Sequence, residues 1–134
     1  MSAWCYAPSP LRVLLVLRVP ERAAGWQPVT GRVEPGESDE AACVREIAEE
    51  TGLPPPEALD ALDHVAEFTG YDGRAYRQRA YAARYVDARP PRVGPEHEDA
   101  RWVEPDEARA MLQWDDDRDT LARLLRQVRQ PSNS

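Results

Sequence analysis

The sequence predicts an α+β fold in which helices cover both faces of a mixed β-sheet. Three features support this prediction: short apolar runs separated by turn residues, one well-capped helix in the middle of the chain, and two helical patterns at its end. The chain has 134 residues, of which 42% are hydrophobic, and this suits one hydrophobic core. We therefore expect a single domain over residues 1–130 and a frayed tail over residues 131–134.

The N-terminal part of the chain is predicted to be extended. Residues 3–7 and 11–19 are apolar runs typical of strands, and the proline-containing turn at residues 8–10 separates them. Residues 26–33 form a third extended segment. These strands lead directly into the central helix.

The central helix is predicted over residues 39–51. Ser38 is a suitable N-cap, and Asp39 and Glu40 favour the positive first turn. Gly52 suits the left-handed C′ position that follows the last turn. The sequence therefore marks both ends of this helix.

Three glutamates crowd one side of the central helix. At about 100° per residue, Glu46, Glu49 and Glu50 fall within an arc of about 100°. The opposite face, which we expect to pack on the sheet, consists of Ala41, Val44, Ala48 and Thr51. Like charges at this spacing cost about 0.2–0.5 kcal/mol per pair, and they lie toward the negative end of the helix dipole. A hard cation such as Mg²⁺ would turn the repulsion into attraction; the alternative is a solvated acidic face.

Further strands are predicted after this helix. Residues 54–56 are three prolines, which end the helix because proline cannot continue it. Strands are expected over residues 64–69 and 75–87, on either side of the hairpin signal Asp72-Gly73. Residues 100–104 form one more short strand.

Two helices are predicted at the C-terminal end, over residues 105–112 and 116–129. Pro105 suits the first turn of the first helix. The second helix carries one apolar stripe, made of Leu121, Leu124, Leu125 and Val128. This stripe is expected to pack on the sheet.

The composition limits the functional class. A net charge of −7 disfavours binding to a nucleic acid polymer. The longest apolar run, Val13–Leu17, is far shorter than the roughly 20 residues that span a membrane. Cys5 and Cys43 have no metal-ligand spacing, and no signal-peptide pattern is found. We expect a cytoplasmic monomer or homodimer that acts on a small molecule.

The stretch from Gly31 to Leu53 resembles the Nudix box. Seven of its fixed positions each require one particular residue type. If each of these residue types makes up roughly one in fifteen residues of proteins, the probability of a chance match is about 10⁻⁸ per start site. Every fixed position of the box is met, by Gly31, Glu37, Arg45, Glu46, Ile47, Glu49, Glu50, Gly52 and Leu53. The resemblance implies the Nudix α/β/α sandwich, with the catalytic helix on one face of the sheet and the C-terminal helices on the other.

Two looser motifs are similar to one branch of the Nudix hydrolase family. Residues 26–31, Trp-Gln-Pro-Val-Thr-Gly, and the pair Glu96-His97 followed by Trp102 resemble a branch that includes dihydroneopterin triphosphate diphosphatase and related nucleoside triphosphate diphosphatases. Residues 29–31 depart from the Pro-Gly-Gly entry of many nucleotide-pool-cleaning relatives. The resemblance therefore favours a nucleoside or pterin triphosphate as substrate.

The resemblance implies hydrolysis of a diphosphate linkage by metal-activated water, with Mg²⁺ or Mn²⁺ as the cofactor. Glu46, Glu49 and Glu50 would be the metal ligands, together with the carbonyl oxygen of Gly31. These residues belong to the loop and the helix that the box joins.

The remaining box residues would hold this arrangement in place. Arg45 would pair with Glu37, and Gly52 would shape the helix exit. We expect Glu96 to accept the proton of the attacking water, and a box glutamate or Glu98 is the alternative.

We expect residues other than the three glutamates to bind the organic part and the terminal phosphates of the substrate. Trp26 is a candidate for stacking on a base or pterin, as are Tyr76, Tyr81 and Trp114, although each could instead be a packing residue. The candidates for binding phosphate are Arg32, Arg77 and Arg79, for which a solvated side chain is the alternative.

Two other functions are compatible with the sequence. One is hydrolysis of a nucleoside diphosphate derivative, such as ADP-ribose or a dinucleoside polyphosphate. The other is a Nudix-like module that binds a nucleotide without hydrolysing it. The complete set of box carboxylates favours catalysis over this last alternative.

Overall fold

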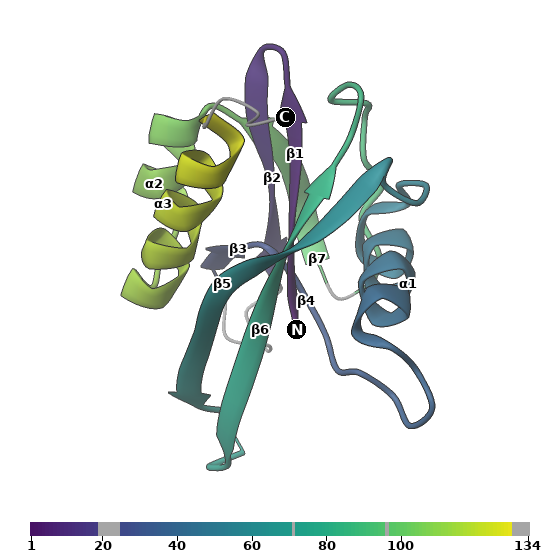
Figure 1. Ribbon diagram of the computed structural model, residues 1–134, viewed down its shortest axis with the longest axis vertical. Helices are drawn as coiled ribbons and strands as arrows, with labels where there is room; N and C mark the ends of the chain where they lie inside the picture. Colours follow the sequence, from purple (N-terminus) through teal and green to yellow (C-terminus); the bar gives the residue numbers. More distant parts are fainter. Residues whose placement is uncertain (19–24, 71, 96, 130–134) are drawn as a thin grey trace.

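A mixed β-sheet lies between helices on its two faces in the computed structural model (Figure 1). The structure describes residues 1–18, 25–70, 72–95 and 97–129. Within these ranges the strands are β1 (Ser2–Pro8), β2 (Leu11–Arg18), β3 (Gly25–Gln27), β4 (Val29–Thr30), β5 (Ala58–Thr69), β6 (Ala75–Arg84) and β7 (His97–Val103). The helices are α1 (Asp39–Thr51), α2 (Pro105–Met111) and α3 (Asp115–Arg129).

Strand β1 lies at the centre of the sheet. It pairs in parallel with β6 and antiparallel with β2 and β4. The hairpin partner of β6 is β5, and β2 also pairs antiparallel with β3 and β7. The parallel β1–β6 pair requires a long crossover, and this crossover contains α1.

Helix α1 has the two ends that the sequence predicted. The Ser38 hydroxyl accepts a hydrogen bond from the Ala41 N–H at 3.1 Å, and Gly52 adopts a φ of 69°. The N–H groups of Arg92 and Gly94 donate to the last carbonyls of the helix, those of Thr51 and Glu50, at 2.6 and 3.3 Å. The loop between β6 and β7 therefore covers the C-terminal end of α1.

The predicted packing face of α1 was wrong. Ala41 and Ala48 are exposed and Val44 is half-buried, so only Thr51 of the expected face is buried. The buried residues of α1 are Ala42, Cys43, Ile47, Glu50 and Thr51. Cys43 and Ile47 pack against the sheet instead. The helix is therefore rotated about its axis relative to the prediction, and this rotation buries Glu50, which belongs to the acidic face.

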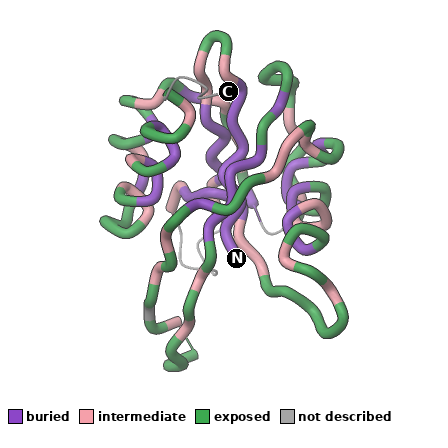
Figure 2. Tube along the Cα trace, viewed as in Figure 1, coloured by how far each residue is buried: buried purple, intermediate pink, exposed green. Residues whose placement is uncertain are grey.

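Two hydrophobic cores lie on opposite faces of the sheet. Successive side chains of a strand point to opposite faces, so β1 and β2 contribute to both cores, which Figure 2 shows as buried chain at the centre. The core under α1 includes Ala3, Cys5, Leu14, Val16, Cys43 and Ile47. The core under α2 and α3 includes Trp4, Val13, Leu15, Leu121 and Leu124. The expected apolar stripe of the last helix therefore packs on the sheet.

Several strand boundaries differ from the prediction. The segment 26–33 is two short strands separated by Pro28, which has no N–H to donate to the sheet. Strand β5 begins at Ala58 rather than 64, and its register with β6 shifts between Ala61 and Val65. This irregularity, in a stretch of Ala and Asp with low β-propensity, hides the strand pattern. The predicted frayed tail, 131–134, lies outside the described residues.

None of the helices in the described ranges is long and apolar enough to cross a membrane. The longest of them is α3, with 15 residues. All but one of the exposed residues of α3 are charged: they are Asp115, Asp116, Asp119, Arg123, Arg126 and Arg129, and the exception is Gln127.

Replacement of Leu124 by alanine should lower the free energy of unfolding by about 2–5 kcal/mol, because the fully buried side chain would leave a cavity in the core under α3. Val86→Ala is the control, since Val86 is 73% exposed, and it should change the free energy by less than about 0.5 kcal/mol. Denaturant titrations of both variants measure the two values. Equal losses would show that α3 does not pack on the sheet as described.

Candidate active site

A bidentate ion pair fixes the loop before α1 to the helix. Arg45 Nε and Nη2 donate to the two carboxylate oxygens of Glu37 at 2.7 and 3.0 Å. The Glu34 N–H donates to the same carboxylate at 3.0 Å. The hydrogen bond from Arg45, followed by the one from Glu34, lowers the pKa of Glu37 to about 2. The pair that the resemblance implied is thus present in the structure.

Arg45 also contacts the acidic side of its own helix. Its Nη1 lies 2.5 Å from Glu46 Oε1 and 3.4 Å from Glu49 Oε2. Its Nη2 donates to the carbonyl oxygen of Arg32 at 2.9 Å. One guanidinium therefore offsets the repulsion among several carboxylates and holds the backbone of the preceding loop.

Gly31 lets Glu46 lie against the end of β4. A Cβ at position 31 would be 2.2 Å from Glu46 Cδ, so any larger residue would force this side chain to move. The Gly31 carbonyl accepts a hydrogen bond from the Met1 amino group at 2.8 Å, and the Gly31 N–H donates to the Met1 carbonyl at 3.0 Å. The N-terminal end of β1 thus borders the acidic site.

Glu50 is a buried carboxyl group beside Glu46. It is 6% exposed, and burial is the main reason that its pKa is raised; the neighbouring Glu46 raises it further. Its Oε1 makes no hydrogen bond within the described part of the chain, and His97 Nε2 lies 3.4 Å away. A buried oxygen without a hydrogen bond is costly unless something binds to it.

These residues fit a hard divalent cation. Such ions take oxygen ligands. Glu50 has a buried oxygen that makes no hydrogen bond within the described residues, and the Glu46 carboxylate lies nearby, in the space left by the missing side chain of Gly31. The described residues hold no preassembled group of three His, Cys, Asp or Glu side chains around a common point. In this arrangement Arg45 contacts Glu46, and the Glu49 side chain is 59% exposed on the helix surface.

The loop that carries the expected proton acceptor is described only in part. Glu96 lies outside the described residues. His97, which follows it, is buried as the first residue of β7, and Glu98 is exposed. Trp102 is a structural residue in this arrangement: its Nε1 donates to the Arg89 carbonyl at 2.8 Å, and its ring lies edge-on to Tyr85.

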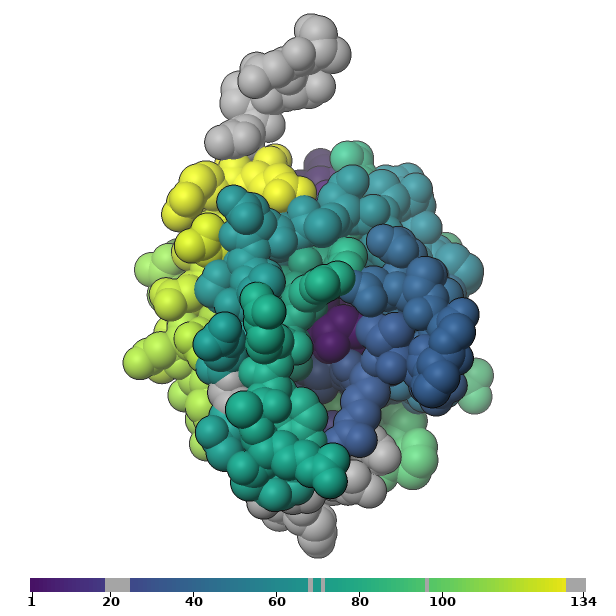
Figure 3. All heavy atoms as spheres, turned by 60° about the horizontal axis from the view of Figure 1, so that its bottom comes forward, coloured from purple at the N-terminus to yellow at the C-terminus, as the bar shows by residue number. Residues whose placement is uncertain are grey.

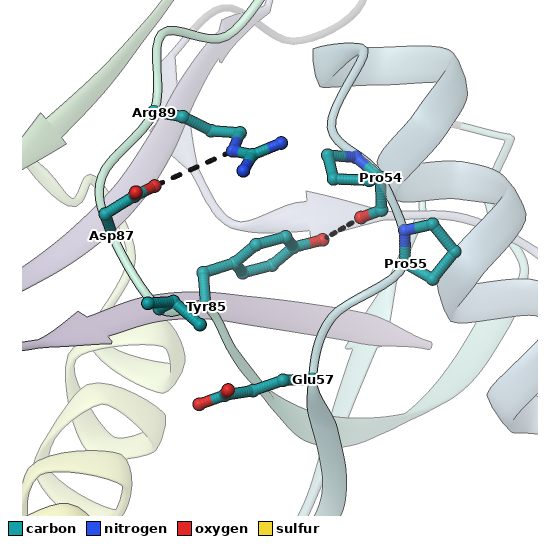
Figure 4. Close-up of a pocket in the computed structure, with 7 residues that line it drawn as sticks. Pro54, Pro55, Glu57, Tyr85, Asp87 and Arg89 are labelled. Carbon is teal, nitrogen blue, oxygen red and sulfur yellow. Dashed lines mark hydrogen bonds and ion pairs between the residues drawn. The ribbon is translucent and has the colours of Figure 1, made fainter.

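A small cavity of 140 Å³ lies beyond the C-terminal end of α1 (Figure 4). Its polar groups already pair with one another, since the Tyr85 hydroxyl donates to the Pro54 carbonyl at 2.7 Å and Arg89 lies 3.6 Å from Asp87. Neither Gly31 nor any of the three box glutamates lines this cavity.

Two of the candidate substrate-binding arginines, Arg32 and Arg79, make contacts that link the β5–β6 hairpin to other segments of the chain. Arg32 Nη2 donates to the Tyr76 hydroxyl at 3.0 Å, which joins the loop after β4 to the β5–β6 hairpin. Arg79 Nη1 lies 3.3 Å from Asp39, the first residue of α1. Figure 3 shows a hollow between this hairpin and the segment around α1, with the N-terminal end of β1 at its floor.

The other two candidates lie apart from the glutamates. Trp26 packs against the core under α2 and α3, with the Arg101 guanidinium 5.3 Å from its ring. The structure therefore places Trp26 on the face of the sheet opposite α1. Arg77 is exposed on the hairpin and lies 3.6 Å from Glu67.

Sequence reasoning missed Arg18 as a site residue. Arg18 ends β2, pairs with His97 across the sheet, and its charge lowers the pKa of Glu50, although burial outweighs this effect. Alternation along β2 places it on the same face as Leu14 and Val16, which pack under α1. The period of two in this strand would have identified it.

A family comparison covers most of the chain. The model of the NUDIX domain matches residues 3–124. This range includes every element from β1 to most of α3.

Solved Nudix structures have the same fold. The dihydroneopterin triphosphate pyrophosphohydrolase of Escherichia coli superposes with a TM-score of 0.79 at 22% identity, over 94% of this chain and 93% of that one. The Nudix domain of NrtR from Shewanella oneidensis, solved with ADP-ribose, superposes with a TM-score of 0.78 at 20% identity, over 95% and 85% of the two chains.

A curated relative is much longer than this chain. It is an octanoyltransferase from Myxococcus xanthus, 37% identical over 115 residues, which are 84% of this chain and 32% of that protein. The chain thus spans about a third of its length. Because the NUDIX domain model matches residues 3–124, with the box complete and the fold shared, this chain belongs to the Nudix hydrolase family.

Proposed function

We propose that this Nudix pyrophosphohydrolase is Mg²⁺-dependent and cleaves the diphosphate linkage of a nucleoside or pterin triphosphate, with water as the nucleophile. The observation that carries the proposal is the pairing of Glu46 with the buried Glu50 beside Gly31, where one oxygen of Glu50 makes no hydrogen bond within the described residues. Two adjacent carboxyl groups at a buried position favour a bound cation.

The box carboxylates are the proposed metal ligands. Glu46 and Glu50 supply oxygens from the buried side of α1, Glu49 supplies one from the exposed side, and the Gly31 carbonyl is the fourth candidate. When bound, Mg²⁺ or Mn²⁺ would neutralise the diphosphate and lower the pKa of the attacking water. The protein positions these oxygens by burial and by the contacts of Arg45.

Arg45 is proposed to act as a positioning residue. Its bidentate pair with Glu37 fixes the guanidinium, and its bond to the Arg32 carbonyl fixes the loop that carries Gly31. A lysine could not make these contacts together, because it has no planar fork of donors. Glu96 is the proposed proton acceptor, and Glu98, which is exposed on the same segment, is the alternative.

A nucleoside diphosphate derivative is the second candidate substrate. This candidate is supported by the fold that the chain shares with the NrtR domain, which was solved in complex with ADP-ribose. Product identification separates the two candidates. A nucleoside triphosphate would yield a monophosphate and diphosphate, whereas ADP-ribose would yield AMP and ribose 5-phosphate. A panel of both substrate types with Mg²⁺ therefore tests the proposal, and no release from any of them would contradict it.

Glu50→Gln should abolish Mg²⁺-dependent hydrolysis and leave the thermal melting curve near that of the wild type. The amide keeps the shape of the side chain but cannot supply a carboxylate ligand. Because burial raises the pKa of Glu50, replacing it by a neutral group costs little stability without metal. Phosphate release and thermal unfolding measure the two effects.

Glu49→Gln is the matched control for Glu50→Gln, since the same change is made on the exposed side of the helix, where the side chain is 59% exposed. We expect a smaller loss of activity in this variant. Wild-type turnover in Glu50→Gln would remove Glu50 from the set of ligands.

Glu37→Gln should reduce stability at neutral pH and have less effect in acid. The folded pKa of Glu37 is about 2, below its ordinary value of 4.5, so the ionised group stabilises the fold above about pH 4.5 and loses this contribution as the pH falls toward 2. The difference in unfolding free energy between wild type and variant, from denaturant titrations between about pH 6 and pH 3, should therefore shrink. A difference that stays constant over this range would contradict the role of the ion pair.

A further inference from the structure

His97 lies against the buried carboxyl group of the acidic site. The side chains of His97 and Glu50 are 0% and 8% exposed. His97 Nε2 lies 3.4 Å from Glu50 Oε1, the oxygen that makes no hydrogen bond within the described residues. Because both side chains are removed from bulk water, the polar atoms of each depend on protein groups or on a ligand.

The segment before His97 is fixed to the C-terminal end of α1 by backbone contacts. The Gly94 N–H donates to the Glu50 carbonyl at 3.3 Å, and the His97 N–H donates to the Gly94 carbonyl at 3.2 Å. A Cβ at Gly94 would be 2.5 Å from the Glu49 carbonyl oxygen, so a larger residue would push this segment away from the helix. The helix that carries Glu50 therefore also sets the position of His97.

The sheet holds His97 from the other side. His97 begins β7 and pairs with Arg18, the last residue of β2. Directly paired residues project from the same face of a sheet, and alternation along β2 places Arg18 on the face that α1 covers. Glu50 therefore meets basic side chains on its sheet side and Glu46 along its own helix.

The chemistry of a carboxylate allows Glu50 to contact a cation and His97 together. Each ionised carboxylate oxygen has two lone pairs, so Oε1 can accept a hydrogen bond from His97 and still bind a metal ion. The distance of 3.4 Å exceeds the roughly 2.7–3.2 Å of an N–H···O hydrogen bond, and a small rotation of the Glu50 carboxyl group would close it. Hydrogen bonds of this kind fix the orientation of ligating carboxylates in metal sites.

We propose that His97 is a positioning residue for Glu50. Its Nε2–H donates to Oε1 and orients the carboxylate toward the cation beside Glu46, and His97 itself contacts neither the cation nor the substrate. The proposal rests on the proposed function, because it takes Glu50 to be a metal ligand. The backbone contacts of Gly94 support this role, since they hold β7 and α1 together beside this one carboxylate.

Calorimetric titration with Mn²⁺ tests the proposal in the absence of substrate, for wild type, His97→Leu, His97→Asn and His97→Gln. The glutamine amide nitrogen reaches the place of Nε2, whereas the shorter asparagine amide reaches only that of Nδ1. His97→Leu and His97→Asn should therefore weaken Mn²⁺ binding by about tenfold or more. His97→Gln should stay within about threefold of wild type, because it keeps a donor in reach of Glu50.

His64→Leu is the matched control, since His64 is the only other histidine in the sequence and lies on β5. Its Kd for Mn²⁺ should stay within about twofold of that of the wild type. Thermal melting with EDTA separates the proposed role from a structural one, because a role in packing alone would lower the melting temperature without distinguishing Gln from Asn in Mn²⁺ binding. The Asn and Gln variants keep the test decisive where His97→Leu does not fold.

Mn²⁺ binding within about twofold of wild type in both His97→Leu and His97→Asn would overturn the proposal, and so would an equal loss in His97→Asn and His97→Gln. The proposed function is judged separately, by hydrolysis and by Glu50→Gln. Mn²⁺ binding that depends on His97, in a protein that hydrolyses none of the substrate panel, would contradict the function alone. Hydrolysis that depends on Glu50, with Mn²⁺ binding unaffected by any change at His97, would contradict the positioning role alone.

Discussion

The contacts of one arginine determine how the acidic residues of this protein can lie together. Arg45 pairs through two hydrogen bonds with Glu37, reaches Glu46 on its own helix and holds the carbonyl of Arg32. Without this cation, the carboxylates of the loop and the helix would repel one another. The guanidinium fork also joins the loop to α1, so the same interaction fixes backbone and charge.

Burial of Glu50 is the second constraint, and it has a cost that the apolar side of α1 must offset. Ile47 and Cys43 are fully buried against the sheet, and the rotation that buries them also turns Glu50 inward. Burial raises the pKa of this carboxyl group, and one of its oxygens makes no hydrogen bond within the described ranges. A group that is costly in the folded protein and lies beside a second carboxylate is typical of a functional site rather than of a stabilising one.

Much of the arrangement could be predicted from local chemistry. The ends of α1 followed from Ser38 and Gly52, because caps depend on neighbouring residues only. The side of α1 that packs could not be predicted in this way. The three glutamates were expected on the side of the helix away from the sheet, but the packing of Ile47 against the sheet buries Glu50. Trp26 shows the same limit, since an aromatic residue in a short strand gives no sign of which face of the sheet it will occupy.

Glu46 and Glu50 are proposed to hold a divalent cation beside Gly31. Anomalous diffraction from crystals soaked in Mn²⁺ would locate this cation, because Mn²⁺ can replace Mg²⁺ at oxygen ligands and is identified by its own signal. We expect a peak at coordination distance, about 2.0–2.6 Å, from carboxylate oxygens of both glutamates. A peak confined to other acidic positions, such as Asp115–Asp117 at the start of α3, with none beside Glu50, would show that these glutamates do not bind the cation.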